Sequence, residues 1–145
     1  MMFMIPGVYQ NEGAAGEKLD PDFAPDAEGV GAMMKYNEQL AKAGALISLD
    51  GLRPSSQGAR VKFKGGKPLV TDGPFTESKE VIGGYWMIDV KSKAEAIEWA
   101  KRVPASEADM IEVRQVFEMS EFPELVQKAA ESPIVREQIR KYEKK

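Results

Sequence analysis

Short apolar runs along the chain predict four β-strands, over residues 3–9, 45–49, 81–90 and 110–117. In the first run Pro6 has no backbone N–H, so this strand must lie at a sheet edge or contain a bulge. The third run is apolar at both alternating sets of positions, because Trp86 falls on one face while Tyr85 and Met87 fall on the other. Both faces of this strand therefore require burial.

Two segments between these runs repeat apolar residues at helical spacing. The first covers residues 25–44, where Asp26 suits the first turn and Gly44 supplies a C-terminal stop. The second begins with the capping-box pattern Ser92-Lys93-Ala94-Glu95 and ends at Pro104. These segments predict two helices, each placed between strands.

Residues 60–71 predict a β-hairpin between the second and third long apolar runs. Residues 60–64 alternate polar with apolar side chains, and residues 67–71 form the returning strand. Gly65-Gly66 fits a two-residue turn whose central residues need positive φ angles. The alternation indicates that one face of the hairpin is exposed to solvent.

The order of elements predicts the α+β class, as a ferredoxin-like βαβ-type antiparallel sheet with two helices on one face. One domain over residues 1–122 carries the sheet, with an exposed loop at residues 11–26, and residues 123–145 form a C-terminal helical extension. Two helices cannot cover both faces of the sheet. We therefore expect a homodimer in which two sheets pack face to face.

Composition and charge limit the kinds of partner that we expect the protein to bind. The net charge of -3 and the pI near 5.2 give no long-range attraction for phosphate backbones, so we expect no nucleic-acid partner. No apolar run is long enough to span a bilayer, and the N-terminal residues 1–5 lack the basic region of a secretory signal. We expect no membrane partner and a cytoplasmic protein.

The chain contains neither cysteine nor histidine, which excludes much chemistry. Disulfides, thiolate nucleophiles, imidazole bases and Ser-His-Asp arrangements are impossible within one chain. Zinc, copper and haem have no plausible ligand set, and no acidic loop suggests an oxygen-ligated cation. We therefore predict no metal and no cofactor.

Asp72-Gly73-Pro74-Phe75 is the segment with the clearest functional potential, and two interpretations stay open. In the structural one, Asp72 caps its own turn, Gly73 permits unusual φ, Pro74 stiffens the backbone and Phe75 fills the core. In the functional one, Asp72 is a catalytic carboxylate at a strand end, acting as a base only if burial raises its pKa from about 3.9. The structural interpretation is favoured.

The same segment resembles a known family. Residues 70–80 and Ile82-Gly83-Gly84-Tyr85-Trp86 are similar to the signature of DGPF-type YCII-related proteins, and weaker similarity extends over residues 1–122. The resemblance implies a dimeric α/β-barrel and no settled activity. It also implies a link to extracytoplasmic-function sigma factors, near which many members are encoded. Smaller relatives have a suspected His-Asp site, which this histidine-free chain cannot form.

Further candidate ligand-binding residues are Arg53, Gly73, Pro74, Phe75, Tyr85 and Arg114. The two arginines could bind an anion bidentately, although surface or interface ion pairs are the commoner role. Tyr85 could line a pocket with Trp86, although strand aromatics more often form the core. Gly83-Gly84 could let a ligand approach the backbone, but a bulge is the favoured interpretation.

Three functions follow from these residues. The first is a small-molecule enzyme or its vestige, with Asp72 and the aromatic strand lining a pocket. The second is a non-catalytic ligand-sensing or partner-binding module. The third is RNA binding on an aromatic sheet platform, which the acidic charge disfavours.

Overall fold

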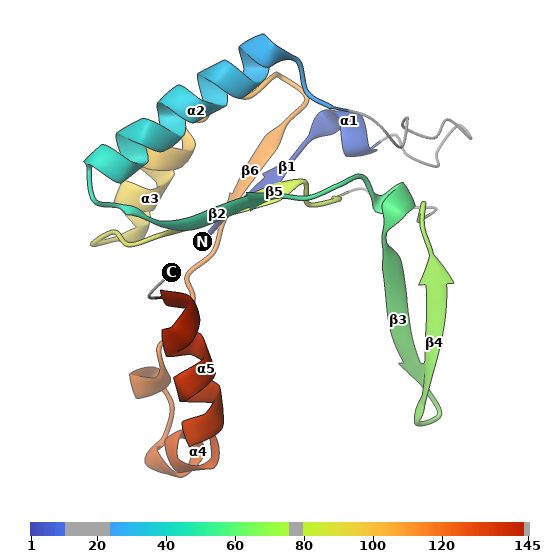
Figure 1. Ribbon diagram of the computed structural model, residues 1–145, viewed down its shortest axis with the longest axis vertical. Helices are drawn as coiled ribbons and strands as arrows, with labels where there is room; N and C mark the ends of the chain where they lie inside the picture. The colour runs from blue at the N-terminus through green and yellow to red at the C-terminus, as the bar shows by residue number, and fades with distance from the viewer. Residues whose placement is uncertain (11–23, 76–79, 144–145) are drawn as a thin grey trace. The chain divides into compact units, whose positions relative to one another are not determined.

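The computed structural model describes residues 1–10, 24–75 and 80–143 (Figure 1). The chain forms two compact units, Met1–Gln115 and Val116–Lys145, each of which is described by itself. Most of the predicted loop at 11–26 lies outside the described residues. The predicted division at residues 122 and 123 stays a prediction.

The first unit contains six strands and three α-helices within its described residues. The strands are β1 Met2–Ile5, β2 Leu46–Gly51, β3 Ala59–Lys64, β4 Lys67–Asp72, β5 Gly84–Ile88 and β6 Met110–Val113. The helices are α1 Gly7–Gln10, α2 Ala27–Lys42 and α3 Lys93–Ala100, with a short 3-10 turn η1 at Ser55–Gln57.

Four strands form one antiparallel sheet in the order β2-β5-β1-β6. The elements β1, α2, β2, β5, α3 and β6 follow one another in the β-α-β-β-α-β order of a ferredoxin-like unit. Figure 1 shows α2 and α3 over the same face of the sheet. The predicted α+β class and the antiparallel sheet are thus confirmed, and the described strands of this chain do not close into a barrel.

The core lies between the sheet and its two helices. Met2 and Trp86 come from the sheet, Tyr36 and Leu40 from α2, and Trp99 from α3, and all five are buried. The Tyr36 ring makes edge contacts with both indoles, with centroids 5.9 Å from Trp86 and 6.4 Å from Trp99. Its hydroxyl donates to the Trp99 carbonyl at 3.0 Å, and burial raises the pKa of Tyr36 to about 12. Aromatic packing therefore joins both helices to the sheet.

The helices begin where the capping residues indicate. The Asp26 carboxylate accepts a hydrogen bond from the Gly29 backbone at 2.7 Å and caps α2. Ser92 accepts one from the Glu95 backbone at 3.2 Å and caps α3. Gly44 adopts a φ of 70° just after α2, the left-handed conformation that ends many helices.

None of the described helices of the first unit lies over the opposite surface of the sheet, which we call the open face: Phe3, Asp50, Tyr85, Met87 and Glu112. The register places these side chains together, because Phe3 lies opposite both Tyr85 and Glu112. Its apolar members Phe3, Tyr85 and Met87 are half-buried. The expectation that β5 is apolar on both faces therefore agrees with the structure, while the homodimer stays a prediction.

Three predicted strands are too long. β1 ends at Ile5 rather than at residue 9, since the Pro6 carbonyl accepts from Tyr9 at 3.0 Å and the chain turns into α1. β5 starts three residues later than predicted, because the Val81 backbone donates to the Gln10 side chain at 3.2 Å instead. β6 stops at Val113, which pairs with Met2, the first residue of β1, its neighbour in the described sheet.

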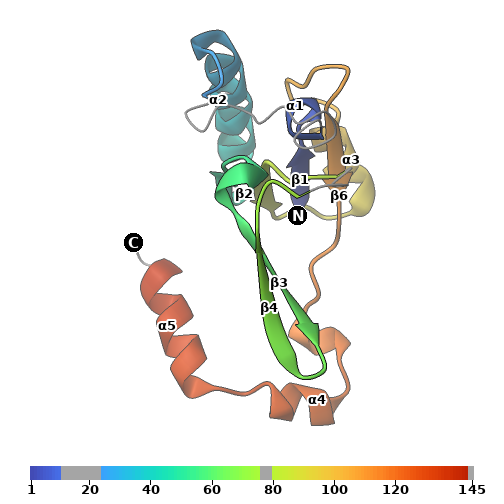
Figure 2. The same ribbon diagram turned by 90° about the vertical axis from the view of Figure 1, so that its right-hand side faces the viewer.

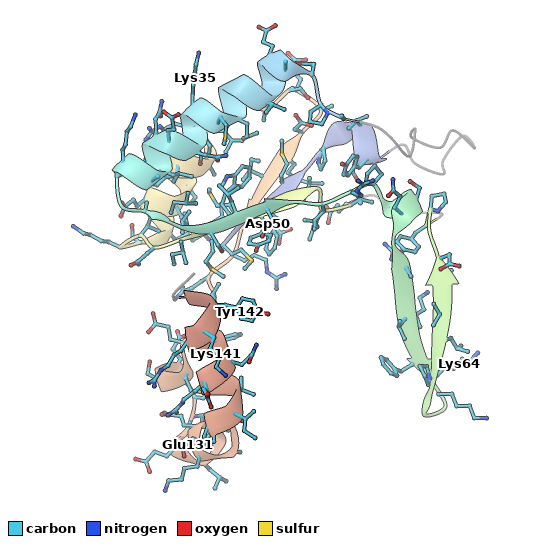
Figure 3. The ribbon with its side chains drawn as sticks, viewed as in Figure 1. Lys35, Asp50, Lys64, Glu131, Lys141 and Tyr142 are labelled. Atoms are coloured by element: carbon cyan, nitrogen blue, oxygen red, sulfur yellow. The ribbon has the colours of Figure 1, made fainter. Side chains whose placement is uncertain are left out.

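The predicted hairpin is confirmed as β3 and β4, paired from Ala59–Asp72 to Lys64–Lys67. Gly65 and Gly66 form the turn with φ angles of 58° and 75°, which glycine adopts without strain. All residues of both strands are exposed. Lys64 lies at the end of the hairpin, as Figure 3 shows.

The second unit contains the 3-10 turn η2 Met119–Glu121 and the helices α4 Glu124–Ala129 and α5 Pro133–Glu143. Figure 2 shows α4 and α5 as separate helices. The C-terminal helix is thus confirmed, although it is preceded by a shorter one. The apolar side chains of α5 are exposed, including Ile134 and Tyr142.

Candidate functional site

A cavity of about 190 Å³ lies between α2 and one end of the sheet in the first unit. Its lining residues come from α2, β1, β2, β5 and the residue before β5: Met4, Met33, Asn37, Leu49, Asp50, Gly51, Gly83, Gly84, Tyr85 and Trp86. Met33 and Asn37 are four residues apart, so both lie on the face of α2 that meets the sheet. Leu49 and Trp86 lie opposite each other across β2 and β5.

Asn37 is the buried polar side chain of this cavity, and it is held in place by Trp86. The indole Nε1 of Trp86 donates to Asn37 Oδ1 at 2.8 Å. Because an indole N–H can only donate, the carboxamide must turn its oxygen toward Trp86. The Nδ2 group then donates to Met34 Sδ at 3.8 Å, a weak acceptor. Asn37 thus keeps a donor that a stronger acceptor could use.

The cavity interior has little charge. Asp50 and Tyr85 contribute to its wall, but their side chains lie on the open face, where the Tyr85 hydroxyl donates to Asp50 Oδ2 at 3.0 Å. Figure 3 labels Asp50 on β2, and Lys35 on the outer side of α2. The side chains that reach inward from the described lining are therefore neutral: methionine, leucine, tryptophan and one amide.

Gly83 and Gly84 allow the backbone to approach its neighbours at the edge of the cavity. A Cβ on Gly83 would lie 2.4 Å from the Pro6 ring, and one on Gly84 would lie 2.9 Å from the Asp50 carbonyl. The favoured bulge at these glycines is wrong, because the register irregularity falls in β2, between Leu46 and Ser48. Close packing, rather than a bulge, requires glycine here.

The segment that begins at Asp72 lies at the base of the hairpin and not in the cavity wall. Asp72 is exposed and is the last residue of β4, opposite Ala59. Gly73 donates from its backbone to the Gly58 carbonyl at 2.9 Å. A Cβ on Gly73 would lie 1.8 Å from the Ser55 carbonyl oxygen, so only glycine fits. Pro74 follows as a half-buried residue.

Two arginines pack beside this segment. The Arg60 guanidinium lies 4.0 Å from the centre of the Phe75 ring, within the range of a cation–π contact. Arg53 donates from Nη1 to Gln57 Oε1 at 3.0 Å, across the turn η1. The structure thus brings Arg53 and the Asp72–Phe75 segment to the same loop region, around Ser55–Gly58.

Arg114 lies elsewhere in the first unit. It follows β6, and its Nε is 3.7 Å from Glu112 Oε1 in an exposed ion pair. Its backbone exchanges hydrogen bonds with Met1. Among the residues that the sequence offered for a pocket or for ligand approach, the described cavity lining includes Gly83, Gly84, Tyr85 and Trp86, but not Arg53, the Asp72–Phe75 segment or Arg114.

The sequence analysis did not single out Asn37, Met33, Leu49 or Met4. A signal was present, because Asn37 is a polar residue beside Tyr36 and three residues before Leu40, within an apolar stripe. Buried asparagine needs a partner, which is a reason to search for one. That partner, Trp86, is 49 residues away in sequence.

Two other kinds of feature are absent from residues 1–10, 24–75 and 80–143. No group of three or more acidic side chains there could hold a metal ion. No helix within the same ranges combines the length and the hydropathy that a bilayer crossing requires.

Comparison with known proteins places the chain in a family. Residues 1–120 match the model of the YCII-related domain. The uncharacterized protein R00369 of Rhizobium meliloti (strain 1021) is 37% identical over 63 residues, which cover 43% of this chain. The match spans about half of that relative, 51% of its length. The chain therefore belongs to the YCII-related family, as its Asp72–Phe75 segment had suggested.

Proposed function

We propose that the protein binds a small, uncharged and mostly apolar molecule in the cavity between α2 and the sheet. The carrying observation is the cavity of about 190 Å³ with one buried amide, Asn37, whose oxygen is already occupied by Trp86. A dry cavity of about 150 Å³ lined by apolar side chains is large enough to bind benzene. The site therefore suits a ligand of about that size.

The ligand class follows from the donors and charges of the lining. Asn37 Nδ2 faces only a weak thioether acceptor at 3.8 Å, so a ligand carbonyl or ether oxygen would make a stronger hydrogen bond. The cavity is partly open to solvent, and an ionised ligand would lose part of its hydration there without gaining an opposite charge from the described inward-facing side chains. The preferred ligand is a neutral molecule with one hydrogen-bond acceptor.

The role is binding rather than turnover. The described side chains that reach into the cavity include no carboxylate, lysine or hydroxyl that could serve as a base or nucleophile. Asp72, the proposed catalytic carboxylate, is not among the lining residues. The family resemblance supports one form of this proposal, in which the protein is a ligand-sensing module built as a dimeric α/β-barrel. A connection to sigma-factor regulation rests on that resemblance alone.

Two ligands of nearly equal size test the proposal. Acetophenone carries a carbonyl that ethylbenzene lacks, so Asn37 should favour acetophenone after correction for their different transfer from water. Binding of each is measured by calorimetry to the wild-type protein and to Asn37→Leu. We expect the ratio of the two affinities to fall about 2- to 12-fold in the variant, as one net hydrogen bond implies.

A second variant tests the location of the ligand. Met33→Trp fills the cavity, whereas Lys35→Trp places the same side chain at an exposed position on the outer side of α2. Met33→Trp should abolish binding of both ligands, and Lys35→Trp should retain it. Equal binding by the two variants would place the ligand elsewhere and contradict the proposal.

A further inference from the structure

The sheet surface that faces α2 carries its side chains in rows that cross β2, β5 and β1. In one row Leu49 lies opposite Trp86. In the next row, which we call the glycine row, Gly51 lies opposite Gly84, and Gly84 lies opposite Met4. Residues two apart in a strand share a face, so both rows face α2. The glycine row therefore gives the cavity a floor that lacks side chains on β2 and β5.

The two glycines of this row differ in what requires them. A Cβ on Gly84 would lie 2.9 Å from the Asp50 carbonyl oxygen, so close packing excludes a side chain there. A Cβ on Gly51 would meet no atom within 4 Å, and Gly51 is not one of the glycines with positive φ. Glycine weakens a strand and often marks a place where a ligand approaches closely. Neither crowding nor backbone conformation explains Gly51, whereas an open cavity does.

The long direction of the cavity follows from the course of α2. Only residues 43–45 separate α2 from β2, so the helix and the strand run in opposite directions. Asn37 lies over the first row, where it accepts from Trp86, and Met33 lies one turn earlier, over the glycine row. Four helical residues span about 6 Å, and two strand residues span about 7 Å. The cavity thus extends from the Asn37 amide to the glycine row beneath Met33.

The glycine row lies at the end of the sheet. Gly51 is the last residue of β2, and Gly84 is the first residue of β5. Met33 and Met4 line the cavity at this end, and their flexible thioether side chains adapt to an apolar chain. A ligand whose oxygen accepts from Asn37 can therefore extend its apolar part over the glycine row toward solvent.

We propose that the cavity selects a linear ligand, with a hydrogen-bond acceptor at one end and an unbranched apolar chain that passes between Met33 and Gly51. This inference rests on the proposed function and specifies the shape of its ligand. Only one direction from Asn37 leads to the glycine row, because the buried core around Leu40 lies in the other direction along α2. Gly51 is then the residue that determines how long a chain the cavity accepts.

Three ketones test the shape of the ligand. 2-Heptanone and 4-heptanone have the same atoms, but only 2-heptanone carries its carbonyl near one end. 2-Butanone has the same methyl ketone head and a chain too short to cross the glycine row. Titrations followed by the Trp86 indole NMR signal should show that the wild-type protein binds 2-heptanone at least about threefold more tightly than 4-heptanone, and at least about tenfold more tightly than 2-butanone.

Substitution of Gly51 tests its role in this selection. Gly51→Val should weaken binding of 2-heptanone at least about tenfold and change binding of 2-butanone less than about twofold. Gly51→Ala adds one methyl group and should show the same selective loss to a smaller extent. The matched control is Ser48→Val, which places the same side chain on β2 but on the other face, opposite Met87. This control should bind both ketones as the wild type does.

The outcomes separate this inference from the proposed function. Equal binding of 2-heptanone and 4-heptanone by the wild type would overturn the linear ligand and leave the cavity as a binding site. Wild-type affinity for 2-heptanone in Gly51→Val, or equal loss of 2-heptanone and 2-butanone in Gly51→Ala, would overturn the role of Gly51. A wild-type protein that binds neither acetophenone nor any of the three ketones would contradict the proposed function, and this inference with it.

Discussion

Trp86 Nε1 lies 2.8 Å from Asn37 Oδ1, and this hydrogen bond joins β5 to α2 at the wall of the cavity. The two residues are buried, with 5% and 9% of their surface exposed. The bond fixes the indole and also determines which end of the carboxamide remains for a ligand. One contact therefore serves both the fold and the proposed site.

Loss of the acceptor at position 37 should destabilise the protein. Asn37→Leu leaves the Trp86 N–H buried without a partner, which we expect to cost about 1–3 kcal/mol in the free energy of unfolding, measured with urea. In a Trp86→Phe background the orphaned donor is absent, so the same substitution should cost less. Additive effects of the two substitutions would show that the hydrogen bond contributes nothing.

The close approach of Gly73 to Ser55 predicts a sharp difference between two glycines. Gly73→Ala would place a methyl group 1.8 Å from a carbonyl oxygen, so we expect a loss of at least about 2 kcal/mol and faster amide exchange in β3 and β4. Gly31→Ala in α2 meets no atom within 4 Å and should stabilise the protein by about 0.5–1 kcal/mol. Both variants are measured by denaturation and by hydrogen exchange.

If Gly73→Ala folds with unchanged amide exchange in β3 and β4, the close packing of Gly73 against the Ser55 carbonyl does not hold the hairpin in place.

Asp109 should make the stability of the first unit depend on acid pH. Burial alone would raise the pKa of Asp109, but hydrogen bonds from Gly7 N at 2.8 Å and Ser106 N at 2.7 Å outweigh it and hold the pKa below 3.8. The folded state thus favours the carboxylate. Its stabilisation is present above the unfolded pKa and is lost as the pH falls through the lower folded pKa.

The variant Asp109→Asn measures this contribution. At pH 7 the free energy of unfolding of the variant should be about 1 kcal/mol lower than that of the wild type. This difference should shrink as the pH falls below about 4. Glu107→Gln, an exposed carboxylate two residues away, is the control and should leave the curve unchanged. A difference for Asp109→Asn that stays constant from pH 7 to pH 2 would contradict the assignment.

Much of the fold could be predicted from local sequence. The hairpin was found because Gly65 and Gly66 are residues that a turn with positive φ requires. The ends of the two long helices were found because Asp26, Ser92 and Gly44 have strong preferences at helix termini. These features depend on residues close together in the chain.

The errors arose where distant segments decide the outcome. Pro6 was correctly identified as a difficulty for a strand, but whether it ends the strand depends on α1 and on the Asp109–Gly7 contact. The length of β6 depends on where β1 begins. Apolar alternation alone contains no information about the partner strand.

The candidate site could be predicted only in part. Tyr85 was identified because an aromatic strand suggests a pocket, and it contributes to the cavity wall. Asn37 was overlooked because its importance depends on Trp86, a residue of another element. The motif made Asp72 a candidate site residue, whereas in the structure Gly73 of the same motif packs closely against the Ser55 carbonyl. A catalytic role for Asp72 stays a prediction.

The most direct measurement of the proposed function is the ¹H–¹⁵N NMR signal of the Trp86 indole during titration with acetophenone. The account predicts that this signal and the Asn37 side-chain amide signals shift together and saturate, while the Trp99 indole signal changes much less. Met33→Trp should remove these shifts, and Lys35→Trp should preserve them. Titration that leaves both the Trp86 and Asn37 signals unchanged, or shifts that persist in Met33→Trp, would contradict ligand binding in this cavity.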